Sequence, residues 1–194
     1  MKDFERNYLT GLRKQFEYYK LLGERTFDQL SEADLFWRYN ESSNSIAVMV
    51  NHLWGNMMSR WTNFLSSDGE KTCRERDLEF EEVLRSKKEM MLKWEEGWAC
   101  LFEALDSVNE GNIDQTVYIR NQEHSIPEAI NRQLAHYAYH IGQIVYVGRM
   151  IRDQQWESLS IPKGKSQSFN RKKFSEEKHR AHFTDEFLNH NAES

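Results

Sequence analysis

The sequence predicts an all-α protein organised as an antiparallel four-helix bundle, and three observations lead to this prediction. The chain of 194 residues contains only two prolines, Pro127 and Pro162, so long stretches carry no helix breaker. Within these stretches apolar residues recur at spacings of three and four, as they do on one face of an α-helix. Long helices joined by short connections favour antiparallel neighbours in a bundle.

Four long helices are expected, each with an apolar stripe that can face a common core. A short helical turn after Ser31, a suitable N-cap residue, precedes the second long helix. The start of the fourth helix is the best-defined boundary, because Ser125 and Glu128 have the capping-box spacing and Pro127 occupies the first turn. The four expected helices span residues 2–29, 44–69, 77–108 and 125–152.

One part of the sequence does not follow the helical pattern. The segment DQTVYIRNQEHS, residues 114–125, contains Thr116 and Tyr118, which favour extended chain. We therefore expect a short extended segment between the third and fourth helices.

The C-terminal part of the chain is polar and is expected to lie outside the bundle. We place the bundle at residues 1–160 and a polar C-terminal tail at residues 161–194. The tail contains His179, His182 and His190, which have no apolar face around them in the sequence. We expect these three histidines to be solvated.

Composition excludes several classes of function. The net charge of −5, from 26 Lys plus Arg and 31 Asp plus Glu, opposes attraction to a polyanion, so we expect no nucleic-acid partner. The N-terminal stretch MKDFERNYL is charged where a signal peptide needs an apolar core, and no apolar run approaches ~18 residues. Cys73 and Cys100 form no metal or disulfide motif, so we expect a cytoplasmic protein without a membrane partner.

Three histidines are candidate metal ligands. His136 and His140 are four residues apart, so on one helix their rings can reach a single ion. Such pairs also occur as solvated or hydrogen-bonded side chains, and the spacing alone leaves both interpretations open. His52 lies nearly opposite the stripe that contains Val50 and Met57. It can serve as a ligand only if its helix is contacted on two sides.

These histidines give the chain a resemblance to the DinB-like superfamily, which includes the bacillithiol S-transferase-like proteins. A His in the second helix, within NHLWGNM, is followed about eighty residues later by an HxxxH pair in the fourth, within QLAHYAYHIGQI. The stretch LSIPKGKSQSFN is similar to the end of an uncharacterised bacterial branch of the superfamily. The resemblance implies a divalent metal, zinc or nickel, bound by His52, His136 and His140. It also implies a homodimer, which the abundance of aromatic residues favours.

The chemistry of such a site suggests two hypotheses for function. Three neutral imidazoles leave the charge of a divalent ion uncompensated and one position open, which is the pattern of a catalytic site. The resemblance then implies a metal-dependent transferase or hydrolase that activates a low-molecular-weight thiol or water. The alternative is a non-catalytic, stress-linked homodimer that binds a metal or another ligand. Candidate side chains for orienting the rings or a substrate are Asn51, Asn56, Gln133 and Gln143.

Overall fold

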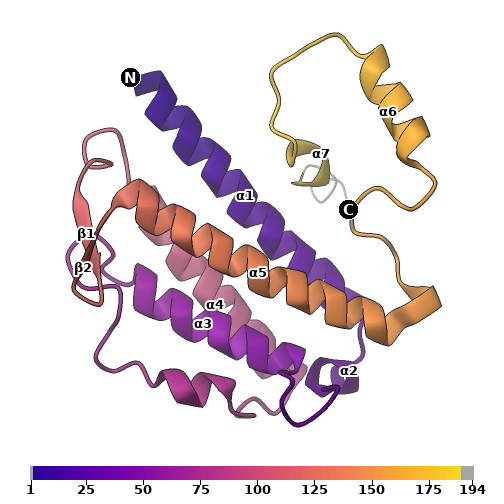
Figure 1. Cartoon of the computed structure of the whole chain (residues 1–194), viewed down its shortest axis with the longest axis horizontal. Coiled ribbons are helices and arrows are strands. Elements are labelled where there is room, and N and C mark those ends of the chain that lie inside the picture. The colour runs from indigo at the N-terminus through magenta and orange to yellow at the C-terminus, as the bar shows by residue number, and fades with distance from the viewer. Residues whose placement is uncertain (1, 189–194) are drawn as a thin grey trace.

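The structure is a computed structural model that describes residues 2–188, and most of these residues are helical. Four long helices pack around the main core, and a small two-stranded sheet lies at one end of them (Figure 1). The prediction of a mostly helical protein is therefore confirmed. The long helices are α1 (Lys2–Asp28), α3 (Ile46–Trp61), α4 (Lys87–Asp106) and α5 (Ile126–Arg152), and the short ones are α2 (Glu32–Phe36), α6 (Ser166–Ser175) and α7 (Asp185–Leu188), with 3₁₀ helices η1 (Arg76–Phe80) and η2 (Asp153–Gln155).

The core forms where the four long helices turn their apolar faces toward one another. Helix α3 packs along α4, and α1 packs along α5. Two buried hydrogen bonds in series cross this core. The Trp61 indole donates to the Tyr137 hydroxyl over 2.8 Å, and that hydroxyl donates to the Asn56 side chain over 3.1 Å. Because buried polar groups must be paired, these hydrogen bonds fix α3 against α5.

Helix α3 is buried on nearly all sides, which its pattern of apolar residues did not predict. It begins after Ser45, whose side chain accepts a hydrogen bond from the Val48 amide. It ends at Trp61, so the predicted end near residue 69 is wrong. The physical reason is Asn63, which adopts a left-handed φ of 50° and whose carbonyl accepts the amides of Ser66 and Ser67 in a turn.

The predicted start of the third long helix at residue 77 is also wrong, because α4 begins at Lys87. Ser86 is its N-cap and accepts a hydrogen bond from the Glu89 amide. The residues from Arg76 to Ser86 form η1 and a connection without regular secondary structure, and Glu79 within η1 is buried. An α-helix starting at residue 77 would need continuous helical hydrogen bonds through this segment. The segment instead forms a 3₁₀ helix that buries the Glu79 side chain.

The expected extended segment is a β-hairpin. Strand β1 (Thr116–Ile119) pairs antiparallel with β2 (Gln122–Ser125), and the two turn residues, Arg120 and Asn121, have φ of 56° and 59°. The Asp68 carboxylate accepts the backbone amides of both turn residues at 2.8 Å. The loop after α3 thereby holds the tip of the hairpin in place. The predicted capping box of Ser125 and Glu128 follows at the start of α5.

The C-terminal region contains helices rather than a fully solvated tail. Helix α7 and the residues before it pack on α1, where Phe183 and Phe187 contact the Tyr18 ring and Asp185 pairs with Lys14 at 2.6 Å. Two aromatic residues four apart supply an apolar face that the polar composition hid. The division of the chain at residue 160 remains a prediction.

The three tail histidines have different outcomes. His179 is exposed, as expected. The prediction is wrong for His182, which is half-buried and lies with its Nδ1 atom 2.7 Å from the Thr184 hydroxyl. His190 lies outside the described residues.

Two further expectations concern the chain as a whole. None of the described helices is both long and apolar enough to cross a membrane. Cys73 is exposed and Cys100 is half-buried, and both are free thiols, as the absence of a disulfide motif predicted.

Candidate metal centre

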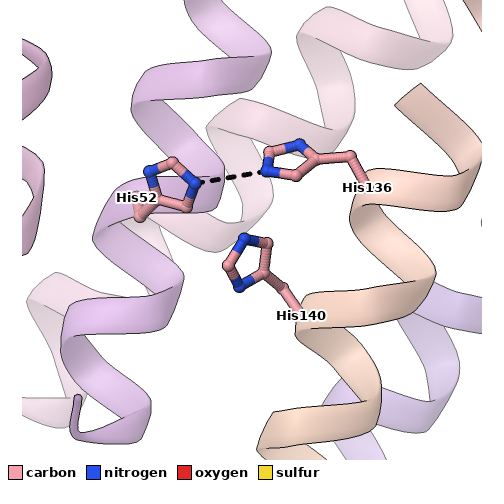
Figure 2. Close-up of side chains that lie close together, drawn as sticks. All are labelled: His52, His136 and His140. Carbon is pink, nitrogen blue, oxygen red and sulfur yellow. Dashed lines mark hydrogen bonds between the residues drawn. The ribbon is translucent and has the colours of Figure 1, made fainter. Parts of the chain in front are cut away.

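His52 on α3 faces His136 and His140 on α5, so the structure brings the three predicted ligand residues together. Figure 2 shows the three rings pointing into the space between the two helices. One nitrogen from each ring can be chosen so that all three lie within 4.8 Å of one another. The Nε2 atoms of His52 and His136 are 3.3 Å apart. Residues separated by most of the bundle in sequence therefore form one compact group of donors.

One pair of these nitrogens already has the separation that a divalent ion requires. Two nitrogens bound at about 2.05 Å to a tetrahedral ion lie about 3.3 Å apart, which is the spacing of the His52 and His136 Nε2 atoms. His52 is 3% exposed and His140 is 9% exposed, and His136 is partly buried. The three-histidine group could hold a metal, and imidazole nitrogens suit zinc, nickel, copper and iron alike.

Helix η1 covers the side of His52 that faces away from the main core. The Phe80 ring stacks on the His52 ring, with centroids 4.5 Å apart and an angle of 27° between the planes. The Asn51 side-chain amide donates to the Glu79 carbonyl over 3.1 Å. Helix α3 is thus contacted on two sides, which is the condition under which His52 can act as a ligand.

Glu79 fixes the orientation of His52. Its Oε2 atom lies 2.8 Å from His52 Nδ1, and Arg74 donates to both carboxylate oxygens, at 2.6 and 2.8 Å. Burial alone would raise the pKa of Glu79, but the hydrogen bonds from His52 and Arg74 and the charge of Arg74 lower it below its ordinary value. An ionised carboxylate can only accept, so His52 carries its proton on Nδ1 and presents the Nε2 lone pair.

The glycine in the middle of α3 makes room for this carboxylate. A Cβ at Gly55 would collide with the side chain of Glu79. Glycine in a helix interior costs about 0.5–1 kcal/mol relative to alanine. At this position the cost is offset by the close approach of Glu79, which any side chain would block.

His140 is oriented in a similar way by a residue on its own helix. Its Nδ1 atom lies 2.9 Å from Gln143 Oε1, so Nδ1 donates and Nε2 is left to bind. Gln143 was one of four predicted orienting residues. Among the described residues the other three form no hydrogen bond of this kind with the rings: Asn51 donates to the Glu79 carbonyl, Asn56 accepts from Tyr137, and the buried Gln133 lines the pocket that contains the three histidines.

Burial keeps the two histidines of α5 neutral. Desolvation, followed by the nearby His140 and His52 and by Arg60 and Arg74, lowers the pKa of His136 to about 3. Desolvation and the proximity of His52 lower the pKa of His140 to about 4, against the hydrogen bond with Gln143. Both rings are therefore unprotonated at neutral pH, which metal binding requires.

Sequence reasoning missed Glu79 and Arg74. They lie in a strongly charged segment, RERDLEF, whose composition is typical of a solvated loop. One signal was present: an isolated glycine inside a helical pattern often marks a close packing contact. Gly55 could have indicated that another segment approaches this face of α3, although not which one.

These features define a mostly helical protein with a candidate three-histidine metal site. Residues 3–165 match the family described as "Protein of unknown function (DUF1572)". The match covers most of the chain, so the protein belongs to this family. A comparison with curated proteins and a comparison with solved structures each gave no match.

Replacing Glu79 by Gln should destabilise the protein. The substitution removes the charge that compensates the buried Arg74, which keeps only its contact with Glu70. We expect the free energy of unfolding to fall by an amount near the lower end of roughly 3–5 kcal/mol. Urea denaturation of the chelator-treated protein measures this change.

Glu82→Gln is the matched control for that measurement. Glu82 pairs with Arg38 at 3.4 Å, and both side chains are nearly half exposed. An exposed pair contributes about 0–1 kcal/mol, so the control should change stability little. Equal losses in the two variants would contradict a structural role for the buried carboxylate.

The two buried histidines should make stability depend on pH. Between about pH 6.5 and pH 4 the unfolded chain binds protons at His136 and His140 while the folded chain does not. The stability that the two neutral histidines contribute is therefore fully present above pH 6.5. It is lost as the pH falls toward their pKa values in the folded protein. In the variant His136→Gln/His140→Gln, the decline in unfolding free energy over this range should be shallower. Urea denaturation with chelator at several pH values tests this, and an unchanged slope would refute it.

Proposed function

We propose that this protein is a DinB-like four-helix bundle that binds one divalent metal ion, zinc or nickel, through His52, His136 and His140. We further propose that it is a metal-dependent transferase or hydrolase acting with a low-molecular-weight thiol or water. The observation that carries the proposal is the convergence of three ring nitrogens from α3 and α5 in a pocket of about 380 Å³. The proposal is also supported by the four long helices, with His52 on α3 and His136 and His140 on α5.

The surroundings of the histidines support a site built to bind rather than an incidental cluster. Glu79 and Gln143 accept hydrogen bonds from the Nδ1 atoms of His52 and His140, which leaves both Nε2 atoms as donors to an ion. The His136 and His140 rings, whose pKa values are lowered by burial, lie beside His52 with no carboxylate among the three. Their shared burial is explained most simply by an ion between them.

The residues of the chain would divide the work as follows. A bound ion would supply a Lewis acid that favours the thiolate or hydroxide form of a nucleophile near neutral pH. The three neutral imidazoles would leave its positive charge uncompensated. Phe80 covers one face of His52 and excludes water from that ring, while Glu79 holds the ring plane toward α5. The pocket beyond the rings is open to a small substrate.

Elemental analysis of the natively purified protein should find about one divalent ion per chain. His52→Ala, His136→Ala and His140→Ala should each lower the metal content severalfold, because loss of one of three ligands leaves too few donors. Circular dichroism should show that the variants keep their helical content.

His179→Ala is the matched control, since His179 is exposed and is not one of the three clustered histidines, so this variant should keep the metal. Full metal occupancy in all three ligand variants would contradict the proposed site. Loss of metal in the control would show that metal retention does not depend specifically on the three histidines.

A panel of small thiols and electrophiles separates the transferase from the non-catalytic alternative. With the metal-loaded protein we expect a thioether or a hydrolysis product, which mass spectrometry detects. Turnover should be at least about tenfold slower in His136→Ala. Turnover that is equal in the variant would contradict metal-dependent chemistry. Absence of turnover with the whole panel would favour a metal- or ligand-binding protein without catalysis.

A further inference from the structure

The pocket that contains the three histidines is lined by five arginines. They are Arg60, Arg74, Arg76, Arg120 and Arg132. No aspartate or glutamate is among the described residues that line this pocket. Such a concentration of one charge is unexpected in a chain whose net charge is −5, so the cations are gathered here against the overall balance.

Two of the five arginines are buried and already neutralised. The Arg60 side chain is 6% exposed and pairs with Glu70 at 2.8 Å, while that of Arg74 is 5% exposed and pairs with Glu79 and Glu70. Their charges are taken up by the two carboxylates that hold the segment over α3. These two arginines are part of the wall of the pocket.

The other three arginines are exposed, line the pocket, and are less completely paired with carboxylates. Arg120 approaches Glu70 at 3.3 Å, but that carboxylate is shared with Arg60 and Arg74. Among the described residues, Arg76 and Arg132 form no ion pair. Within the part of the chain that the structure describes, the five guanidinium groups thus share two paired carboxylates, Glu70 and Glu79.

Local contacts fix the guanidinium groups of Arg76 and Arg132 beside the pocket. The Arg76 guanidinium lies over the Phe80 ring, 5.1 Å from its centroid, on the residue that also stacks on His52. The Arg132 Nη1 atom lies 3.1 Å from His124 Nε2. Because His124 Nδ1 donates to the Gln122 carbonyl, its Nε2 accepts from the guanidinium.

The β-hairpin places Arg120 beside the same pocket. Arg120 is the first turn residue, and the Asp68 carboxylate fixes its backbone amide at 2.8 Å. The Gly69 amide also donates to the Tyr118 carbonyl over 2.8 Å, which ties the strand end to the loop after α3. The hairpin therefore contributes to the pocket in two ways. It carries Arg120, and its residue His124 holds Arg132.

We propose that Arg76, Arg120 and Arg132 bind an oxyanion group, carboxylate or phosphate, of a small substrate whose reacting atom reaches the three histidines. This inference rests on the proposed function and names the class of substrate for that site. A guanidinium presents paired N–H donors that match carboxylate and phosphate oxygens. A pocket of about 380 Å³ admits a small molecule but encloses no polymer.

Titration of the chelator-treated full-length protein with inorganic phosphate and with succinate tests this inference. Isothermal calorimetry should detect saturable binding of at least one of these probes at one site per chain, weakening as salt is added. In Arg76→Gln/Arg120→Gln/Arg132→Gln the affinity should fall at least about tenfold. Tighter binding of phosphate would assign a phosphorylated ligand, and tighter binding of succinate would assign a carboxylate.

Arg149→Gln/Arg171→Gln/Arg180→Gln removes the same charge from exposed positions that do not line the pocket, and should bind the probes as the unaltered protein does. The single variants Arg76→Gln and Arg132→Gln provide the test if the triple variant is unstable, each with a severalfold loss. Failure of the unaltered protein to bind either probe, or equal losses in the pocket and control variants, would overturn the inference. Because no metal is present in this titration, its outcome is independent of the metal analysis.

Discussion

The buried carboxylate of Glu79 is the interaction on which the candidate site depends. This carboxylate accepts hydrogen bonds from His52 Nδ1 and from two nitrogens of Arg74. The backbone carbonyl of Glu79 accepts a further hydrogen bond from Asn51. A carboxylate placed this deeply is stable only when fully paired, so the four residues must be arranged together. This requirement explains why α3 needs Gly55, why η1 interrupts the predicted helix, and why His52 faces α5.

Much of the fold could be predicted because it follows from local patterns. Apolar spacing predicted long helices, and the pairing of Ser125 with Glu128 placed the start of α5. The predicted end of α3 was wrong because the chain turns at Asn63 in a left-handed conformation, and the predicted start of α4 was wrong because Glu79 is buried by contacts with other segments. Helical periodicity carries no information about either feature.

The site was predictable in part. The spacing of His136 and His140 indicated that they could act together, and the resemblance added His52, against its position on the helical wheel. The carboxylate and arginines came from a charged loop and a hairpin, where sequence patterns are typical of solvated chain. Gln143 was among several equivalent amides, and only the structure separates it from Asn56 and Gln133.

X-ray absorption spectroscopy of the zinc-loaded protein tests the central claim most directly, because it counts the atoms bound to the ion. The convergence of His52, His136 and His140 predicts three imidazole nitrogens at roughly 2.0–2.1 Å, with one oxygen completing the shell. A shell containing sulfur, or one with fewer than two imidazoles, would contradict the assignment of these histidines as the metal ligands.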